Sequence, residues 1–465
     1  MSKSVLINCN TNESQIKMKH ILITFLICTA AISGFSQQMP PGNQIYNFTV
    51  TDCINYAYDH QHDVANAKLD VTSAGYHIKE IIGQGLPQIT GAASFLDYLK
   101  IPTTLIPGDF FGKPGTFVPL KFGVTYQSGL SANLSQILFD PSYIVGLQGR
   151  DTYKQLYDRS YTRTKIEANV NVTKAYYQVL VSVEQLKLLE ANINELKQQL
   201  DETNARNKQG FVEKIDVDRL TVQYNSLITT RENTNRLLAL NYQLLKFQMG
   251  MTIENELLLK DKLEDVQLDV TVADATNDTT LYRNRIEYAL LETQNKLDHY
   301  DIKLKKGLFL PKLTANASYA PSYQNNNFGS LYSLGFPSSY VSLSLTVPIF
   351  SGWQHLNQFK QSQINLLKSQ NDMYEMKNTI NLQVNQARTT YINGLQSLND
   401  QKKNMALAEE VLRVSKIKYE QGVGSSIEVT QSETAVQEAD NSYIQGLYEA
   451  LVSKVDLDKA YGRIK

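Results

Sequence analysis

The side chains best able to bind a metal or transfer a proton in this sequence are its histidines, of which there are six. His60 and His62 are two residues apart, so on a helix they lie on different faces and make poor joint ligands. The sequence around His77, His299 and His355 indicates no Cys, Asp or Glu at a spacing that would complete a ligand set. The histidines therefore predict neither a metal site nor a catalytic site.

The segment 422–426 is rich in glycine, and a glycine-rich loop can hold a phosphate group. Such a loop also needs a lysine and a preceding strand, and neither is present here. The formal net charge is -1, and the basic residues are not clustered as nucleic-acid binding requires. We therefore expect no enzyme activity, no cofactor and no nucleic-acid partner.

Two acidic residues follow glycines at the same spacing in two similar turns. Gly422 is followed six residues later by Glu428, and Gly210 is followed six residues later by Asp216. A glycine can end a helix in the left-handed conformation without strain, and an acidic residue in the first turn of the next helix complements its dipole. Each turn is therefore predicted to join two helices into a hairpin.

The elements around the two turns indicate an internal duplication. The first repeat, residues 37–250, is predicted to contain a helix (49–83) that Thr51 or Asp52 caps, a strand (86–95), a Pro- and Gly-rich loop (101–119), a strand (122–139) and a long helical hairpin. Residues 251–279 form a connector. The second repeat, residues 280–465, is predicted to follow the same order, with a helix (280–306), strands at 310–319 and 340–350 around a loop (321–339), and a second long hairpin.

Apolar residues at steps of three and four predict a coiled-coil seam inside the first hairpin. They are Leu186, Leu189, Ile193, Leu196 and Leu200 before the turn, and Val217, Leu220, Tyr224 and Leu227 after it. The long helices are therefore predicted to pack in antiparallel pairs.

Residues 1–36 have the pattern of a secretory signal peptide. Lys19 and His20 precede an apolar run (21–32), and small residues follow at the spacing for cleavage near Gln37. Met18 is an alternative start, because the polar stretch before it fits an export signal poorly. No later stretch reaches the roughly 18 apolar residues of a membrane-spanning helix. An exported chain of this kind is soluble, attached to a surface or a β-barrel.

The four predicted strands have the length of tilted membrane strands, about 10–14 residues. Four strands cannot enclose a lumen, and open sheet edges in a bilayer cost several kcal/mol for each unpaired group. A ring of three chains would give a twelve-stranded barrel. The predicted fold is a mixed α+β membrane protein with four transmembrane strands per protomer and a long antiparallel coiled-coil barrel. An exported coiled-coil structural or adhesive protein without a pore is the alternative.

The two turns, Leu-Pro pairs at 86–87 and 310–311, and the run Val-Pro-Ile-Phe-Ser-Gly at 347–352 resemble the TolC family of bacterial outer membrane efflux proteins. The resemblance extends over nearly the whole mature chain. It implies a homotrimeric channel-tunnel in the outer membrane, in contact with its lipid, whose helical part lies in the periplasm. It also implies a passive exit duct that works with a periplasmic adaptor and an inner membrane pump.

The resemblance also implies roles for residues of the turns. The adaptor-docking tips would consist of Gly210, Phe211, Val212, Gly422, Val423, Gly424 and Ser425. The periplasmic gate would consist of Tyr419, Asp216, Glu428 and Gln431. Glu428 matches the first acidic residue of a ring just inside the tip, Gln431 stands where a second is expected, and Tyr419 matches a tyrosine that holds the tip closed. Alternatively, the glycines only permit the turns and the acidic residues only stabilise helix starts.

Overall fold

The structure is a computed structural model that describes residues 45–112, 114–263, 268 and 280–465. The predicted signal peptide and part of the predicted connector lie outside these residues. Residues 47–253 and 257–465 form one compact unit, and apart from β1 and β6 all helices and strands given below lie wholly within it. The division into two sequence repeats stays a prediction.

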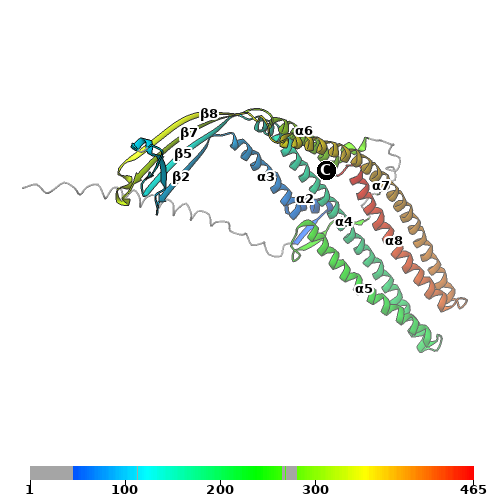
Figure 1. The fold of residues 1–465 in the computed structure, drawn as a ribbon. Coiled ribbons are helices and arrows are strands. Elements are labelled where there is room, and N and C mark those ends of the chain that lie inside the picture. The colour runs from blue at the N-terminus through cyan, green and yellow to red at the C-terminus, as the bar shows by residue number, and fades with distance from the viewer. Residues whose placement is uncertain (1–44, 113, 264–267, 269–279) are drawn as a thin grey trace, which may run out of the picture. The chain divides into compact units, whose positions relative to one another are not determined.

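A four-stranded antiparallel sheet contains the strands β2 (Gln88–Asp97), β5 (Tyr126–Phe139), β7 (Lys312–Asn325) and β8 (Gly335–Thr346). Its order is β2-β5-β7-β8, so the first and last strands are the edges (Figure 1). Pro87 and Pro311 directly precede β2 and β7, where a missing N–H donor interrupts no ladder hydrogen bond. The two strand pairs expected from the sequence are therefore neighbours in one sheet.

Both predicted loops between the strands are partly wrong. The segment 101–119 contains β3 (Thr103–Pro107) and the start of β4 (Phe117–Lys121), which pair antiparallel around the short helix η1 (Gly108–Phe111). The segment 321–339 contains the end of β7, the short helix η5 (Phe328–Ser333) and the start of β8. Proline is tolerated in β3 and β4 because each strand of this two-stranded ribbon has a free edge.

The single helix predicted at 49–83 is two helices, α2 (Val50–His60) and α3 (His62–Gln84). Gln61 interrupts them in an extended conformation (φ -68°, ψ 131°), and its side chain accepts a hydrogen bond from the Val64 N–H. The predicted caps are wrong as well. Thr49 caps α2 and forms a capping box with Asp52, whose side chain accepts from the Thr49 N–H.

The long helices form two antiparallel hairpins, α4 (Pro141–Lys208) with α5 (Lys214–Met249) and α7 (Gln354–Glu420) with α8 (Ser426–Ala460) (Figure 1). The remaining elements are β1 (Ile45–Phe48), β6 (Glu256–Leu259), η4 (Leu281–Asn284) and α6 (Ile286–Gly307). The 68 residues of α4 begin directly after β5, so the far end of that helix is about 100 Å along its path from the sheet. Among the described helices, none is both long enough and apolar enough to span a membrane.

The hairpins are held together by apolar seams. In the first hairpin, Ile193, Leu196, Leu220 and Leu227 are buried in one cluster, with Leu189, Leu200 and Tyr224 packed against it. These residues confirm most of the predicted seam. In the second hairpin, Leu412, Val429 and Val436 form the equivalent cluster, and Tyr419 packs on it. Each turn therefore joins two helices that are fixed by apolar packing close to the tip.

Candidate functional site

The first turn ends α4 at a glycine in the left-handed conformation. Gly210 has a φ of +82°, and the Phe211 N–H donates to the Arg206 carbonyl oxygen (3.0 Å). This pattern satisfies carbonyl groups that the helix end would leave unpaired. Asn207 Nδ2 donates to the carbonyl oxygen of half-buried Val212 (2.6 Å), which closes the loop. The turn is therefore well defined, and it leaves the Phe211 ring 79% exposed.

The second turn ends α7 in a similar way. Gly422 has a φ of +75°, and the N–H groups of Val423 and Gly424 donate to the Lys418 carbonyl oxygen (3.0 and 3.1 Å). A Cβ atom at Gly424 would lie 3.0 Å from the Lys418 Cβ, so a larger residue here would be crowded because the chain folds closely over the helix end. The Val423 side chain is 76% exposed. Both predicted hairpin turns are confirmed, and each presents an apolar side chain to solvent.

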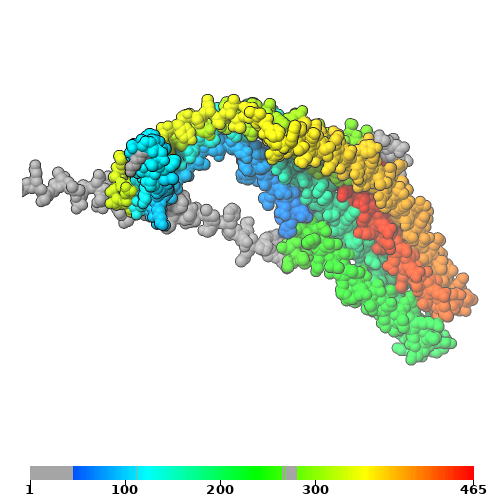
Figure 2. All heavy atoms as spheres, viewed as in Figure 1, coloured from blue at the N-terminus to red at the C-terminus, as the bar shows by residue number. Residues whose placement is uncertain are grey.

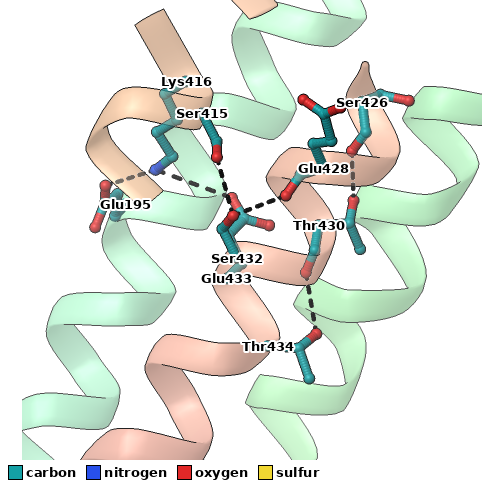
Figure 3. A network of polar contacts seen from close by, with 9 residues as sticks. All are labelled: Glu195, Ser415, Lys416, Ser426, Glu428, Thr430, Ser432, Glu433 and Thr434. Atoms are coloured by element: carbon teal, nitrogen blue, oxygen red, sulfur yellow. Dashed lines mark hydrogen bonds and ion pairs between the residues drawn. The ribbon is translucent and has the colours of Figure 1, made fainter. Parts of the chain in front are cut away.

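The first two turns of α8 contain two of the predicted gate residues. Ser425 is the N-cap, and its Oγ accepts from the Glu428 N–H (3.2 Å). The Glu428 side chain is exposed and lies near the positive end of the helix dipole (Figure 3). Gln431 is exposed too. Ser425 therefore has a structural role in capping, whereas Glu428 and Gln431 project from the helix surface of this single chain.

Asp216 connects the two hairpins. Its Oδ1 accepts a hydrogen bond from Ser426 Oγ (2.5 Å), which belongs to the N-terminus of α8, and lies 3.3 Å from Arg219 Nη1 on its own helix. Arg219 Nη1 also donates to Ser426 Oγ (3.4 Å). In Figure 2 the two tips, green for the first hairpin and orange for the second, lie at the same end of the helical region. The contact of Asp216 is therefore well placed to hold them together.

Tyr419 lies between the ends of α4 and α7. It lines a groove of about 220 Å³ together with Arg206 and Glu202 of α4. Burial raises the pKa of the Tyr419 phenol, the Asp216 carboxylate raises it further, and the Arg206 guanidinium opposes the rise. Tyr419 therefore stays a neutral hydrogen-bonding group at neutral pH.

The structure thus brings Tyr419 and Asp216 into one polar region and places Glu428 and Gln431 on an exposed face of α8. Sequence reasoning missed the two partners of Asp216. Arg219 could have been found, because residues three apart face each other on a helix. Ser426 could not, because it is 210 residues away in the chain.

One statement about the histidines is wrong. His77 Nδ1 lies 3.0 Å from Glu80 Oε2, so an acidic partner three residues away does exist. Both side chains are about half exposed or more, and among the described residues no group of three His, Cys, Asp or Glu side chains could hold a metal ion. The pair is an exposed contact on one face of α3.

Residues 271–463 match the family model described as "Outer membrane efflux protein". The chain is 22% identical to outer membrane protein TolC of Salmonella enteritidis over 360 residues, which are 73% of this chain and 70% of that protein. It is 24% identical to the probable efflux pump outer membrane protein TtgC of Pseudomonas putida over 361 residues, 74% of this chain and 72% of that protein.

A search of solved structures agrees with the sequence comparison. The fold is similar to that of CusC, studied for transmembrane channel formation, with a TM-score of 0.72, 15% identity and coverage of 92% of this chain and 95% of CusC. At that identity the likeness concerns the fold alone. The family model, the curated relatives and the fold together show that this chain is similar to the outer membrane efflux proteins, of which TolC is one.

Proposed function

We propose that three copies of this chain form a homotrimeric channel-tunnel in the bacterial outer membrane. Each protomer contributes four strands to a twelve-stranded barrel in contact with outer membrane lipid, and its hairpins continue the tube into the periplasm. The channel is a passive exit duct of a tripartite system, in which a periplasmic adaptor docks at the tips and an inner membrane pump supplies the energy. The pore-free structural or adhesive alternative is set aside because the relatives are outer membrane efflux proteins by name.

The proposal rests mainly on the two edge strands of the sheet, which are exposed along their whole length in the single chain. Every residue of β2 and of β8 is exposed in the single chain, including the apolar side chains Val341 (81%), Leu343 (70%) and Leu345 (65%). These alternate along β8 with Ser342 and Ser344, which gives one apolar face and one polar face. An apolar outer face and a polar inner face are what a membrane barrel with an aqueous interior needs.

The strand order also permits closure. The order β2-β5-β7-β8 is antiparallel throughout, so β2 and β8 run in opposite directions. The β8 edge of one protomer can therefore pair antiparallel with the β2 edge of the next. Three protomers repeated in this way close the cylinder and remove every open edge, which a bilayer does not tolerate.

The gate is the second part of the proposal. In a trimer the exposed Glu428 side chains form a ring of three carboxylates just inside the tip, which attracts cations and repels anions. Asp216, Ser426 and Tyr419 keep the two hairpins of a protomer together in the closed state. Docking of the adaptor on Phe211 and Val423 favours an alternative packing of the helix ends, and the tip opens.

Fractionation of the native protein tests the channel. The protein should accompany outer membranes through a density gradient, and an unheated sample should migrate on a denaturing gel as a species of three times the mass of the heated one. A product that is soluble without detergent would contradict the proposal. For the docking tips, Phe211→Ser with Val423→Ser should leave the trimer intact but abolish ethidium export in cells that export this dye through the wild-type protein.

A further inference from the structure

A charged side chain is buried at the place where the two hairpins meet. Glu433 of α8 is 6% exposed and lies near Lys416 of α7 and Glu195 of α4 (Figure 3). Gln199 of α4 and Gln223 of α5 are its other polar neighbours. It lies seven residues beyond Ser426, within two helical turns of the contact between Asp216 and α8. The carboxyl group therefore belongs to the interior of the helical region, close to the predicted gate but separate from it.

The ammonium group of Lys416 is shared unequally between two carboxylates. Lys416 Nζ lies 2.6 Å from Glu195 Oε1 and 3.9 Å from Glu433 Oε1. The Glu195 side chain is 58% exposed, so this stronger pair is partly solvated. The charge of Lys416 is therefore balanced mainly by Glu195, and Glu433 receives only the weaker contact.

The other oxygen of Glu433 is only weakly compensated, because the nearby amides form no well-aligned hydrogen bond with it. Within the described part of the chain, Glu433 Oε2 has no hydrogen-bond partner, and the same is true of both polar side-chain atoms of Gln223 and of Gln199 Oε1. A buried carboxylate without full hydrogen bonding is costly, and a carboxyl group in this position lowers the cost by taking up a proton. A protonated Glu433 would also supply the O–H donor that the neighbouring amide oxygens lack.

The surroundings of Glu433 raise the pKa of its carboxyl group on balance. Burial raises the pKa of its carboxyl group, the Lys416 ammonium and the amides of Gln223 and Gln199 oppose the rise, and the Glu195 carboxylate adds to it. These groups come from α4, α5 and α7, which are the helices packed against this part of α8. The pKa of Glu433 lies above its ordinary value of 4.5 as a result.

A small cavity gives the carboxyl group access to protons. It is lined by Glu433, Lys416, Gln223 and Asn192 among others, and it leaves about 20 Å³ for the centre of a water molecule. A space of roughly 10–15 Å³ by this measure is enough for one water. Proton exchange at Glu433 therefore does not require the hairpins to separate first.

We propose that Glu433 is a proton-binding site of the junction between the two hairpins, which holds a proton while the hairpins are packed together and releases it when they separate. The packed state favours the neutral carboxylic acid more than the separated state does. In the separated state water solvates it, the O–H bond breaks, and a carboxylate and a free proton are formed. The consequence for export rests on the proposed function, because only in a gated channel does this separation open a pore.

The direction of the pH effect follows from linkage. Because the pKa is higher in the packed state than in the solvated state, the packed state binds the proton more tightly and is favoured as pH falls. Its advantage is lost as pH rises through the pKa of the packed state. Lowering the pH should therefore tighten the junction, and raising it should loosen the junction.

Hydrogen–deuterium exchange of the intact trimer in detergent tests this inference. The amides of 426–440 are followed between about pH 5 and pH 8, and each rate is corrected for the intrinsic effect of pH on exchange. In the wild type the opening constant of this segment should rise with pH, by at most about tenfold per unit. Glu433→Gln should remove this dependence. Glu438→Gln, which changes an exposed acid on the same helix, should retain it.

An opening constant of the wild type that does not change with pH would overturn the inference, and so would an unchanged pH dependence in Glu433→Gln. The pH dependence of the wild-type opening constant tests the inference even if a variant folds poorly. Conductance measured in planar bilayers separates this result from the proposed function. A pH-dependent junction in a protein that forms no channel would contradict the channel but support the proton site.

Discussion

Replacing Asp216 by Ala tests whether the contact between the hairpins holds the tip closed. The change removes the hydrogen bond from Ser426 Oγ (2.5 Å) and the pair with Arg219 (3.3 Å). A hydrogen bond to a charged group contributes about 1.5–3 kcal/mol when shielded, and the Asp216 side chain is 16% exposed. The pair with Arg219 is more solvated and adds about 0.3–0.5 kcal/mol.

The pair with Arg219 lies within α5 and is present in both states, so only the hydrogen bond to Ser426 bears on opening. Its loss, taken as about 2 kcal/mol, should shift the opening equilibrium of the tip about thirtyfold toward the open state. Open probability in planar lipid bilayers measures this shift directly. Asp218→Ala is the matched control, because this exposed acid lies two residues further along α5. Ser426→Ala and Asp216→Ala should also be strongly non-additive in a double-mutant cycle. An open probability equal to that of the Asp218 control, or additive effects in the cycle, would refute the reasoning.

The remaining predictions concern the ring, the barrel and the buried thiol. Glu428→Gln should raise the permeability of chloride relative to potassium in planar bilayers, since a carboxylate ring favours cations; an unchanged ratio would remove Glu428 from the gate. Leu343→Arg should reduce the amount of trimer in outer membranes, because a lipid-facing arginine costs about 2–4 kcal/mol, whereas Ser342→Arg should assemble normally; equal yields would contradict a lipid-facing side of β8. Burial raises the pKa of the Cys53 thiol to about 12, so at pH 8 it should react with a disulfide reagent at least about a hundredfold more slowly in the folded protein than in denaturant; rapid labelling of the folded protein would exclude this environment.

The turns could be predicted from the sequence because their cause is local. Gly210 and Gly422 have positive φ values, which glycine alone adopts without strain, and the apolar steps on both sides of them specify helices. The Leu-Pro pairs indicated strand starts for an equally local reason, because proline lacks an N–H donor and is tolerated where a strand begins. The conformation of these elements is determined by neighbouring residues in the sequence and does not depend on distant contacts.

The missed features have several causes. The break at Gln61 contains neither Gly nor Pro, and it depends on a side chain that caps the next helix. The capping box of Thr49 and Asp52 was visible as a pair three residues apart, but the helix was started too late to use it. The ribbon of β3 and β4 was hidden by prolines that a free edge tolerates.

The contacts of the candidate site are the least accessible to sequence reasoning. The roles of Asp216 and Tyr419 came from the family resemblance, whereas Ser426 and Asp216 meet only because two separate hairpins pack together. Glu433 has no local sign of its burial, because an acidic residue on a long helix is usually exposed. Its environment is set by three other helices, and only the packing of both hairpins reveals it.

A density map of the purified protein in lipid nanodiscs, obtained by electron cryo-microscopy, would show whether three chains share one barrel. We expect a three-fold symmetric particle in which β8 of each protomer pairs with β2 of its neighbour around an open lumen. A monomeric particle whose four-stranded sheet is covered by its own helices, or a trimer whose axis is filled with side chains, would contradict it.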